Sequence, residues 1–223
     1  MGSIDPEPNA VKVTTTPHGI TTITIGRNAR RNAVDGPTGR KLYDAFVNFE
    51  NDSTQKVCVF YGANGNFCAG FDLHEVAKWD ESRNDSYKGP IVDPGHAVEG
   101  RNLGPIGPSR LDVEKPVISA VAVYAVAGGL ELSLLGDIRV AEEEAIFGVF
   151  CRRWGVPLID GGTVRLQAII GLGRALDLIL PEGALARMKL SLWNWLTEWC
   201  RREKPLKRPP RSQRVCSASR KNA

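Results

Sequence analysis

Two short segments rich in small residues carry the clearest chemical signal in this chain. They are residues 66–73 (NFCAGFDL) and 124–132 (YAVAGGLEL), and each leads from an expected strand into an expected helix. Small residues let a ligand approach the backbone, and the first N–H groups of a helix lack internal partners. Two such turns can aim two N–H donors at one oxygen, as stabilisation of a thioester enolate requires. Taken singly, each turn is also explained by tight packing alone.

Three further side chains have ionisable groups that need an interpretation. Glu131 lies one turn into the second helix, where its carboxylate can be held near a pocket or can interact only with its helix N-terminus. Cys151 is followed by two arginines, which either lower the pKa of its thiol or face solvent. Asp160 can supply a second carboxylate or cap a helix that begins near Gly162.

The elements that must position these residues alternate between strand and helix. A Val/Ile/Thr-rich hairpin is expected at 11–16 and 20–25, with further strands at 57–61, 116–124 and 138–141 and helices at 37–49, 129–136 and 163–170. Such alternation favours an α/β or mixed domain. Residues 80–111 are polar and rich in Gly and Pro without a clear period, so we expect a long mobile loop there.

Composition narrows the class of protein. A hydrophobic fraction of 42% is ordinary for a soluble globular domain, and no apolar run reaches the ~20 residues of a membrane span. Residues 1–8 resemble neither a secretory signal nor a transit peptide, so we expect an intracellular protein, cytoplasmic by default, with mitochondria or peroxisomes as alternatives. Cys58, Cys68 and Cys151 suit reduced thiols, and no spacing of Cys and His predicts a metal site.

Together, the motifs resemble the enoyl-CoA hydratase/isomerase (crotonase) family over about residues 19–180. The matching segments are 31–33 (RNA), 67–73 (FCAGFDL), 115–118 (KPVI), 127–132 (AGGLEL) and 161–166 (GGTVRL). The resemblance implies an α/β fold, a crotonase-like spiral of ββα units. It also implies an acyl-CoA thioester as substrate, no metal or other cofactor, no nucleic-acid or membrane partner, and assembly into homotrimers or hexamers.

The resemblance also implies residue roles. The backbone N–H groups of Ala69 and Gly128 would form an oxyanion hole around the thioester oxygen, and Glu131 would act as general acid/base beside the α and β carbons. Further substrate-binding positions are implied at Cys68, Gly70, Asp72, Leu73, Gly129 and Cys151.

The chain departs from the family pattern at the second acidic residue, which in hydratases of the family works together with the residue that Glu131 matches. Hydratases of the family carry another Glu at the position that Cys151 occupies here. Asp160 is a candidate replacement, although other relatives place their carboxylate at the position of Ile159. We therefore expect an enoyl-CoA hydratase, with an isomerase or a catalytically weak acyl-CoA binder as alternatives. Nucleic-acid binding through the basic C-terminal residues is the least favoured alternative.

The last part of the chain changes character. We assign residues 1–180 to the acyl-CoA domain and 181–223 to a basic tail outside the family pattern, expected to be disordered. The family's C-terminal helical region is thus truncated or replaced. Read one base out of frame, residues 192–205 can encode the family's usual Leu-Ala-Asn-Arg-Val-Val-Pro segment. We therefore hypothesise a frameshift or mis-spliced junction near codon 181, with a genuine lineage-specific tail as the alternative.

Overall fold

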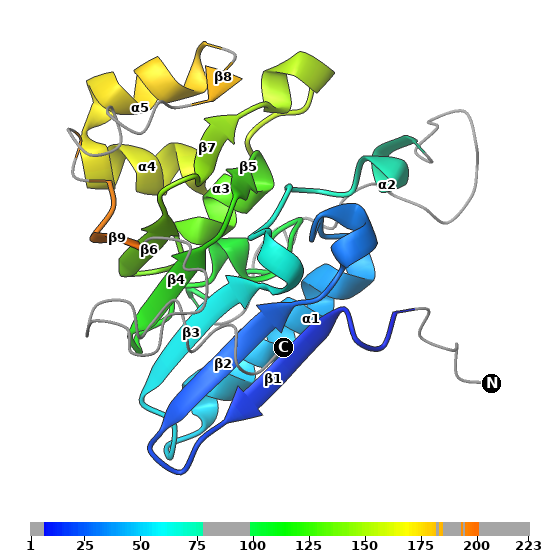
Figure 1. Ribbon diagram of the computed structural model, residues 1–223, viewed down its shortest axis with the longest axis vertical. Coiled ribbons are helices and arrows are strands. Elements are labelled where there is room, and N and C mark those ends of the chain that lie inside the picture. Colours follow the sequence, from blue (N-terminus) through cyan, green and yellow to red (C-terminus); the bar gives the residue numbers. More distant parts are fainter. Residues whose placement is uncertain (1–6, 78–98, 182, 185–192, 194, 201–223) are drawn as a thin grey trace.

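A six-stranded sheet forms the centre of the molecule in the computed structural model, which describes residues 7–77, 99–181, 183–184, 193 and 195–200 (Figure 1). Its strands lie in the order β1 (Val11–Thr15), β2 (Ile20–Ile25), β3 (Val57–Gly62), β4 (Val117–Val121), β6 (Ile138–Glu142) and β9 (Glu198–Cys200). Only the β1–β2 pair of this sheet is antiparallel. A smaller sheet contains β5 (Tyr124–Val126), β7 (Ile146–Val149) and β8 (Gly183–Ala184).

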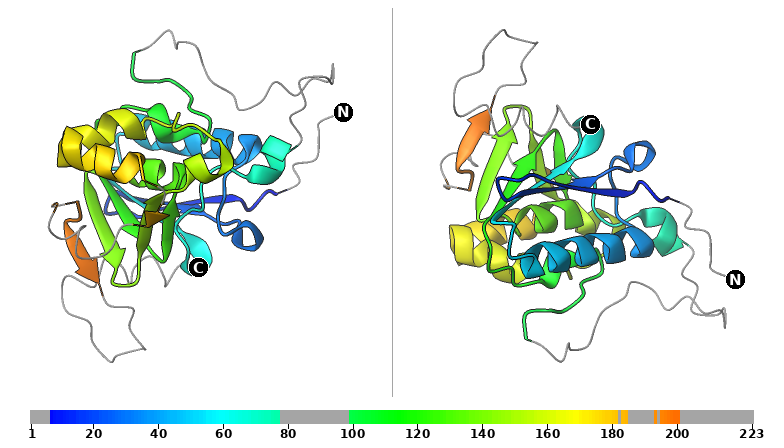
Figure 2. Two further views of the ribbon diagram at one scale, coloured as in Figure 1. Left: turned by 90° about the horizontal axis from the view of Figure 1, so that it is seen from above. Right: turned by 90° about the horizontal axis from the view of Figure 1, so that it is seen from below.

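The longer helices cover one face of the large sheet. They are α1 (Gly36–Asn51), α4 (Gly162–Ile170) and α5 (Leu172–Ile179), and Figure 2 shows all three on the same side of the sheet. The shorter helices α2 (Leu73–Ala77) and α3 (Gly128–Ser133) follow the two small-residue turns. Among the described residues, no helix is long and apolar enough to cross a membrane.

The first turn is anchored in the core by aromatic packing. Phe46 of α1 meets Phe60 of β3 edge to face with ring centroids 5.2 Å apart, and Phe60 meets Phe67 in the same manner at 5.3 Å. All three side chains are fully buried. Edge-to-face pairs add about 0.5–1.5 kcal/mol to the burial of the rings, so the turn that follows Phe67 starts from a rigid point.

Two expectations about the elements need correction. The strand expected at 116–124 is divided between two sheets, because Val123 adopts a positive φ of 47° that separates β4 from β5. The expected mobile loop is also wrong for its last part, since Gly104 and Gly107 exchange backbone hydrogen bonds of 2.8 and 2.9 Å and residues 104–109 are buried. Residues 80–98 of that loop lie outside the described residues.

Part of the C-terminal tail belongs to the folded body. β9 pairs in parallel with β6, and the fully buried Trp195 packs edge to face on Phe147 at 5.8 Å. The expectation of disorder is therefore wrong for residues 195–200. Most of the remaining tail lies outside the described residues.

Candidate active site

The two small-residue turns pack directly against each other. Cys68 forms a parallel bridge with Ala125, in which Cys68 N–H donates to Tyr124 O at 2.8 Å. A Cβ at Gly129 would lie 2.1 Å from Cys68 O, and a Cβ at Gly70 (φ +98°) would lie 3.1 Å from Gly128 N. Glycine is therefore required at both positions for this close approach.

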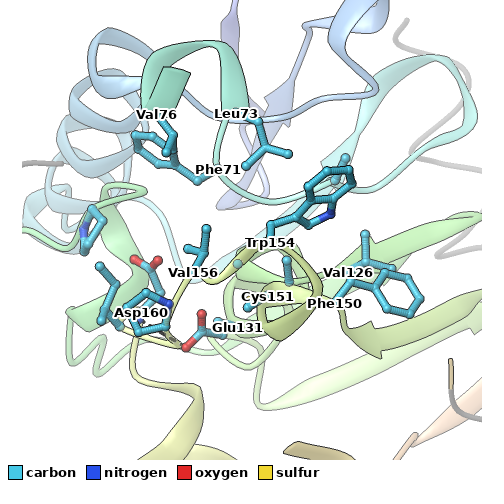
Figure 3. Close-up of a pocket in the computed structure, with 16 residues that line it drawn as sticks. Phe71, Leu73, Val76, Val126, Glu131, Phe150, Cys151, Trp154, Val156 and Asp160 are labelled. Atoms are coloured by element: carbon cyan, nitrogen blue, oxygen red, sulfur yellow. Dashed lines mark hydrogen bonds between the residues drawn. The ribbon is translucent and has the colours of Figure 1, made fainter. Parts of the chain in front are cut away.

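A cavity of about 200 Å³ opens beside the paired turns. Figure 3 shows the carboxylate-bearing residues Glu131 and Asp160 on one side of it and Phe71, Leu73 and Val76 on the other. Most of the other lining residues are apolar. A small polar group set within an apolar wall is typical of a site for a small molecule with a hydrophobic portion.

Glu131 holds a buried carboxyl group with a perturbed pKa. Its side chain is 1% exposed, and its Oε1 accepts hydrogen bonds from Asp160 N–H at 3.1 Å and Gly162 N–H at 2.8 Å. Burial, followed by the negative charge of Asp160, raises the pKa of Glu131 to about 8. Glu131 thus contacts the N-terminus of α4 and not only its own helix, and it can carry a proton at neutral pH.

Asp160 is a second buried carboxylate of the cavity. Its Oδ1 accepts hydrogen bonds from Ser109 Oγ–H at 2.5 Å and from Ile106 N–H at 3.1 Å. Burial raises the pKa of Asp160, and these two donors and Arg110 oppose that shift. The capping alternative is wrong, because Gly161 is the N-cap of α4 and no side chain caps it.

Cys151 contributes a neutral thiol to the cavity wall. Burial, followed by the negative charge of Glu131, raises the pKa of Cys151 to about 12. The two arginines do not activate it: Arg152 donates to Leu180 O at 2.5 Å, and Arg153 stacks over Phe150 at 5.7 Å. A thiol with this pKa is a poor substitute for a carboxylate at pH 7.

The structure contradicts the prediction that Ala69 supplies an oxyanion donor. Ala69 N–H already donates to Arg31 O at 3.2 Å. The N–H of Phe71 takes no part in the corresponding pairing with Val34. Val34 N–H donates to Gly70 O at 2.8 Å, and Asp72 N–H donates to Val34 O at 2.9 Å, so Val34 bonds to the residues on either side of Phe71. Within the described ranges, neither Phe71 N–H nor Gly128 N–H has an acceptor.

The structure sorts the predicted residues into those that line the cavity and those that support it. The cavity is lined by Ala69, Leu73, Gly128, Glu131, Cys151 and Asp160, and by the unpredicted Phe71. Cys68, Gly70, Asp72 and Gly129 do not line it. Cys68 is buried and accepts a hydrogen bond from Gly70 N–H at 3.3 Å, whereas Asp72 pairs with Arg27 at 3.1 Å. In the part of the chain that the structure describes, no cluster of His, Cys, Asp and Glu is arranged to hold a metal ion.

The parallel sheet, the paired turns and the buried carboxylates together define a crotonase-type fold with a site suited to proton transfer. The family model for enoyl-CoA hydratase/isomerase matches residues 15–184, and the chain belongs to this family. The match extends to residue 184, four residues into the segment 181–223 that we assigned to the tail.

Several curated proteins are similar to the chain. It is 35% identical to enoyl-CoA hydratase EchA19 of Mycobacterium tuberculosis over 71% of this chain and 56% of the relative. It is 32% identical to 1,2-epoxyphenylacetyl-CoA isomerase of Escherichia coli over 80% of this chain and 65% of the relative. The chain thus spans less than two thirds of these relatives. The crystal structure of enoyl-CoA hydratase EchA1 from Mycobacterium marinum matches 96% of this chain and 75% of that chain, with a TM-score of 0.73 and 28% identity.

Proposed function

We propose that this protein transfers protons at the α and β carbons of an acyl-CoA thioester, with hydration of a 2-enoyl-CoA as the leading reaction. The observation that carries the proposal is the pair of buried carboxylates, Glu131 and Asp160, in one apolar cavity beside two backbone N–H groups that have no acceptor among the described residues. The names of the relatives, hydratases and an isomerase of CoA thioesters, support the substrate class.

The two free N–H groups serve as the oxyanion hole in this proposal. Phe71 N–H and Gly128 N–H come from adjoining turns, and both residues line the cavity. A thioester oxygen bound between them would gain negative charge as the enolate forms. Fixed donors in an enclosed site stabilise such a charge without reorganising, which is the largest contribution that many enzymes make.

The carboxylates take complementary roles. The negative charge of Asp160 raises the pKa of Glu131, and the hydrogen bonds from Ser109 and Ile106 favour the ionised form of Asp160, so we assign Asp160 as the base and Glu131 as the acid. Asp160 removes a proton from water as the oxygen adds to the β carbon, and Glu131 donates its proton to the α carbon. The same pair can shift a double bond by removing a proton at one carbon and returning one at another. CoA enters as part of the substrate, and the mechanism uses no metal.

Turnover of short 2-enoyl-CoA and 3-enoyl-CoA substrates tests the proposal. Glu131→Gln and Asp160→Asn should each lower kcat by about 10²–10⁴-fold, with acyl-CoA binding retained. Hydration of crotonyl-CoA supports the leading reaction, and conversion of 3-enoyl-CoA to 2-enoyl-CoA supports the isomerase. Binding of acyl-CoA without turnover of either substrate would make the protein a non-catalytic binder and refute the proposal. The homotrimeric or hexameric assembly and the intracellular compartment stay predictions.

A further inference from the structure

The segment 104–111 is fastened to the segment that carries Asp160. Arg110 donates to Ile159 O through Nε at 3.0 Å and Nη2 at 2.7 Å. Arg165 of α4 donates in the opposite direction, to Ser109 O and to Leu111 O. Two arginines therefore connect these segments, which lie about fifty residues apart in the chain.

Ser109 lies at the centre of this connection and is fully buried. Its Oγ–H donates to Asp160 Oδ1 at 2.5 Å. A Cβ at Gly104 would lie 2.0 Å from Ser109 Oγ, so only glycine at position 104 leaves space for the hydroxyl. The hydroxyl is thus enclosed on one side and directed at the carboxylate on the other.

The second partner of Asp160 fixes which oxygen exchanges a proton. Ile106 N–H also donates to Oδ1, at 3.1 Å, and a backbone N–H can only donate. Oδ1 therefore remains an acceptor in both protonation states. Oδ2 lies 3.6 Å from the Cβ position of Gly128, on the side of the oxyanion turn, so the exchanged proton is carried on Oδ2.

We propose that Ser109 is a positioning residue that holds Asp160 ionised with Oδ2 directed into the cavity, so that Asp160 can act as the base. This inference rests on the proposed function for the role of the base, but the ionisation of Asp160 can be measured without it. A donor to a carboxylate stabilises its charged form, and Ser109 is the side-chain donor to Asp160 among the described residues.

Four other titratable or charged groups face Asp160 and must be separated from the effect of Ser109. Arg110 favours the ionised carboxylate. The thiols of Cys68 and Cys151 have pKa values near 12 and stay neutral. Glu131 remains as the other carboxyl group of the cavity, so the experiment needs a reference variant that lacks the Asp160 carboxyl group.

Infrared titration of the protonated carboxyl band in the unliganded full chain tests the inference, with Asp160→Asn subtracted to isolate Asp160. Ser109→Ala should move the Asp160 midpoint up by about one to two pH units, since a hydrogen bond to a charged group is lost. The acid limb of kcat/KM should move by the same amount. If Ser109→Ala does not fold, Ser109→Cys keeps a weak donor and should give a smaller shift in the same direction.

Two results overturn the inference. One is an Asp160 midpoint that stays within a few tenths of a unit in a folded Ser109 variant. The other is an acid-limb shift that persists when Ser109→Ala is placed in an Asp160→Asn background. Failure of the proposed function looks different: the infrared midpoint moves as expected, but neither 2-enoyl-CoA nor 3-enoyl-CoA is turned over.

Discussion

Replacement of single backbone amides by esters can decide which turn residue binds the thioester oxygen. Phenyllactate at position 71 removes Phe71 N–H and keeps the benzyl side chain. Lactate at position 69 removes Ala69 N–H and keeps the methyl group, which makes it a matched control. Both esters also weaken the preceding carbonyl as an acceptor, and both preceding carbonyls accept one backbone hydrogen bond, at 2.8 Å for Gly70 and 3.2 Å for Cys68.

The expected magnitudes differ because the two N–H groups have different partners. Phe71 N–H has no acceptor among the described residues, so its loss should cost little stability but about 2.7–4 kcal/mol of transition-state stabilisation, which is a 10²–10³-fold decrease in kcat. Ala69 N–H donates to Arg31 O at 3.2 Å, so its loss should lower the free energy of unfolding by about 0.5–1.5 kcal/mol and change kcat only slightly.

The assay compares kcat for crotonyl-CoA and the midpoint of urea unfolding in the two ester proteins and the unmodified chain. Circular dichroism must show that both ester proteins are folded. A 10²-fold decrease in kcat for the Ala69 ester, together with unchanged turnover for the Phe71 ester, would refute our assignment and restore the prediction made from the sequence.

Three further predictions concern the residues that line the cavity and the tail. Cys151→Ala should change kcat less than tenfold, because the thiol is neutral (pKa about 12), whereas Asp160→Asn should lower it by about 10²–10⁴-fold; equal losses would contradict this. The pKa of Glu131 is about 8 in the folded state and ordinarily 4.5, so between these pH values the folded state binds more protons than the unfolded state. The free energy of unfolding should therefore fall as pH rises, by at most about 1.4 kcal/mol per pH unit, when it is measured by chemical denaturation. Glu131→Gln should reduce this dependence on pH. Trp195→Ala should lower the free energy of unfolding by about 3–5 kcal/mol, whereas Trp154→Ala, at a 64% exposed position, should change it by less than about 0.5 kcal/mol; similar values would show that the tail does not pack as described.

The paired turns could be predicted from the sequence, because runs of small residues that include Gly70 and Gly129 indicate close approach of the backbone wherever they occur. The sequence did not allow the donor to be identified. Which N–H in residues 69–71 is free depends on the pairing of this turn with Val34 and Arg31, some forty residues earlier in the chain. The register of that pairing shows that Ala69 N–H is bonded, whereas Phe71 N–H has no acceptor in the part of the chain that the structure describes.

The role of Asp160 could not be settled from the sequence for a similar reason. An Asp before two glycines fits the usual pattern of a helix cap, and local preference favours that interpretation. In the structure the Asp160 side chain instead accepts hydrogen bonds from Ser109 and Ile106, which belong to a segment that we expected to be mobile. The position of the Asp160 carboxylate thus depends on a loop that has no periodic pattern to predict it.

Two sets of observations on the tail favour different explanations of its origin. The family match ends at residue 184, and codons chosen for residues 192–205 can encode the family's segment in a shifted frame, which together favour a frameshift near codon 181. Against this, Trp195 is fully buried on Phe147, and β9 extends the sheet at β6. Cores accept different apolar residues of suitable volume, so the burial of Trp195 alone does not require a native tail. Sequencing the transcript across codon 181 separates these explanations: we expect a displaced base or junction, and an uninterrupted, well-supported reading frame through Ala223 would refute the frameshift.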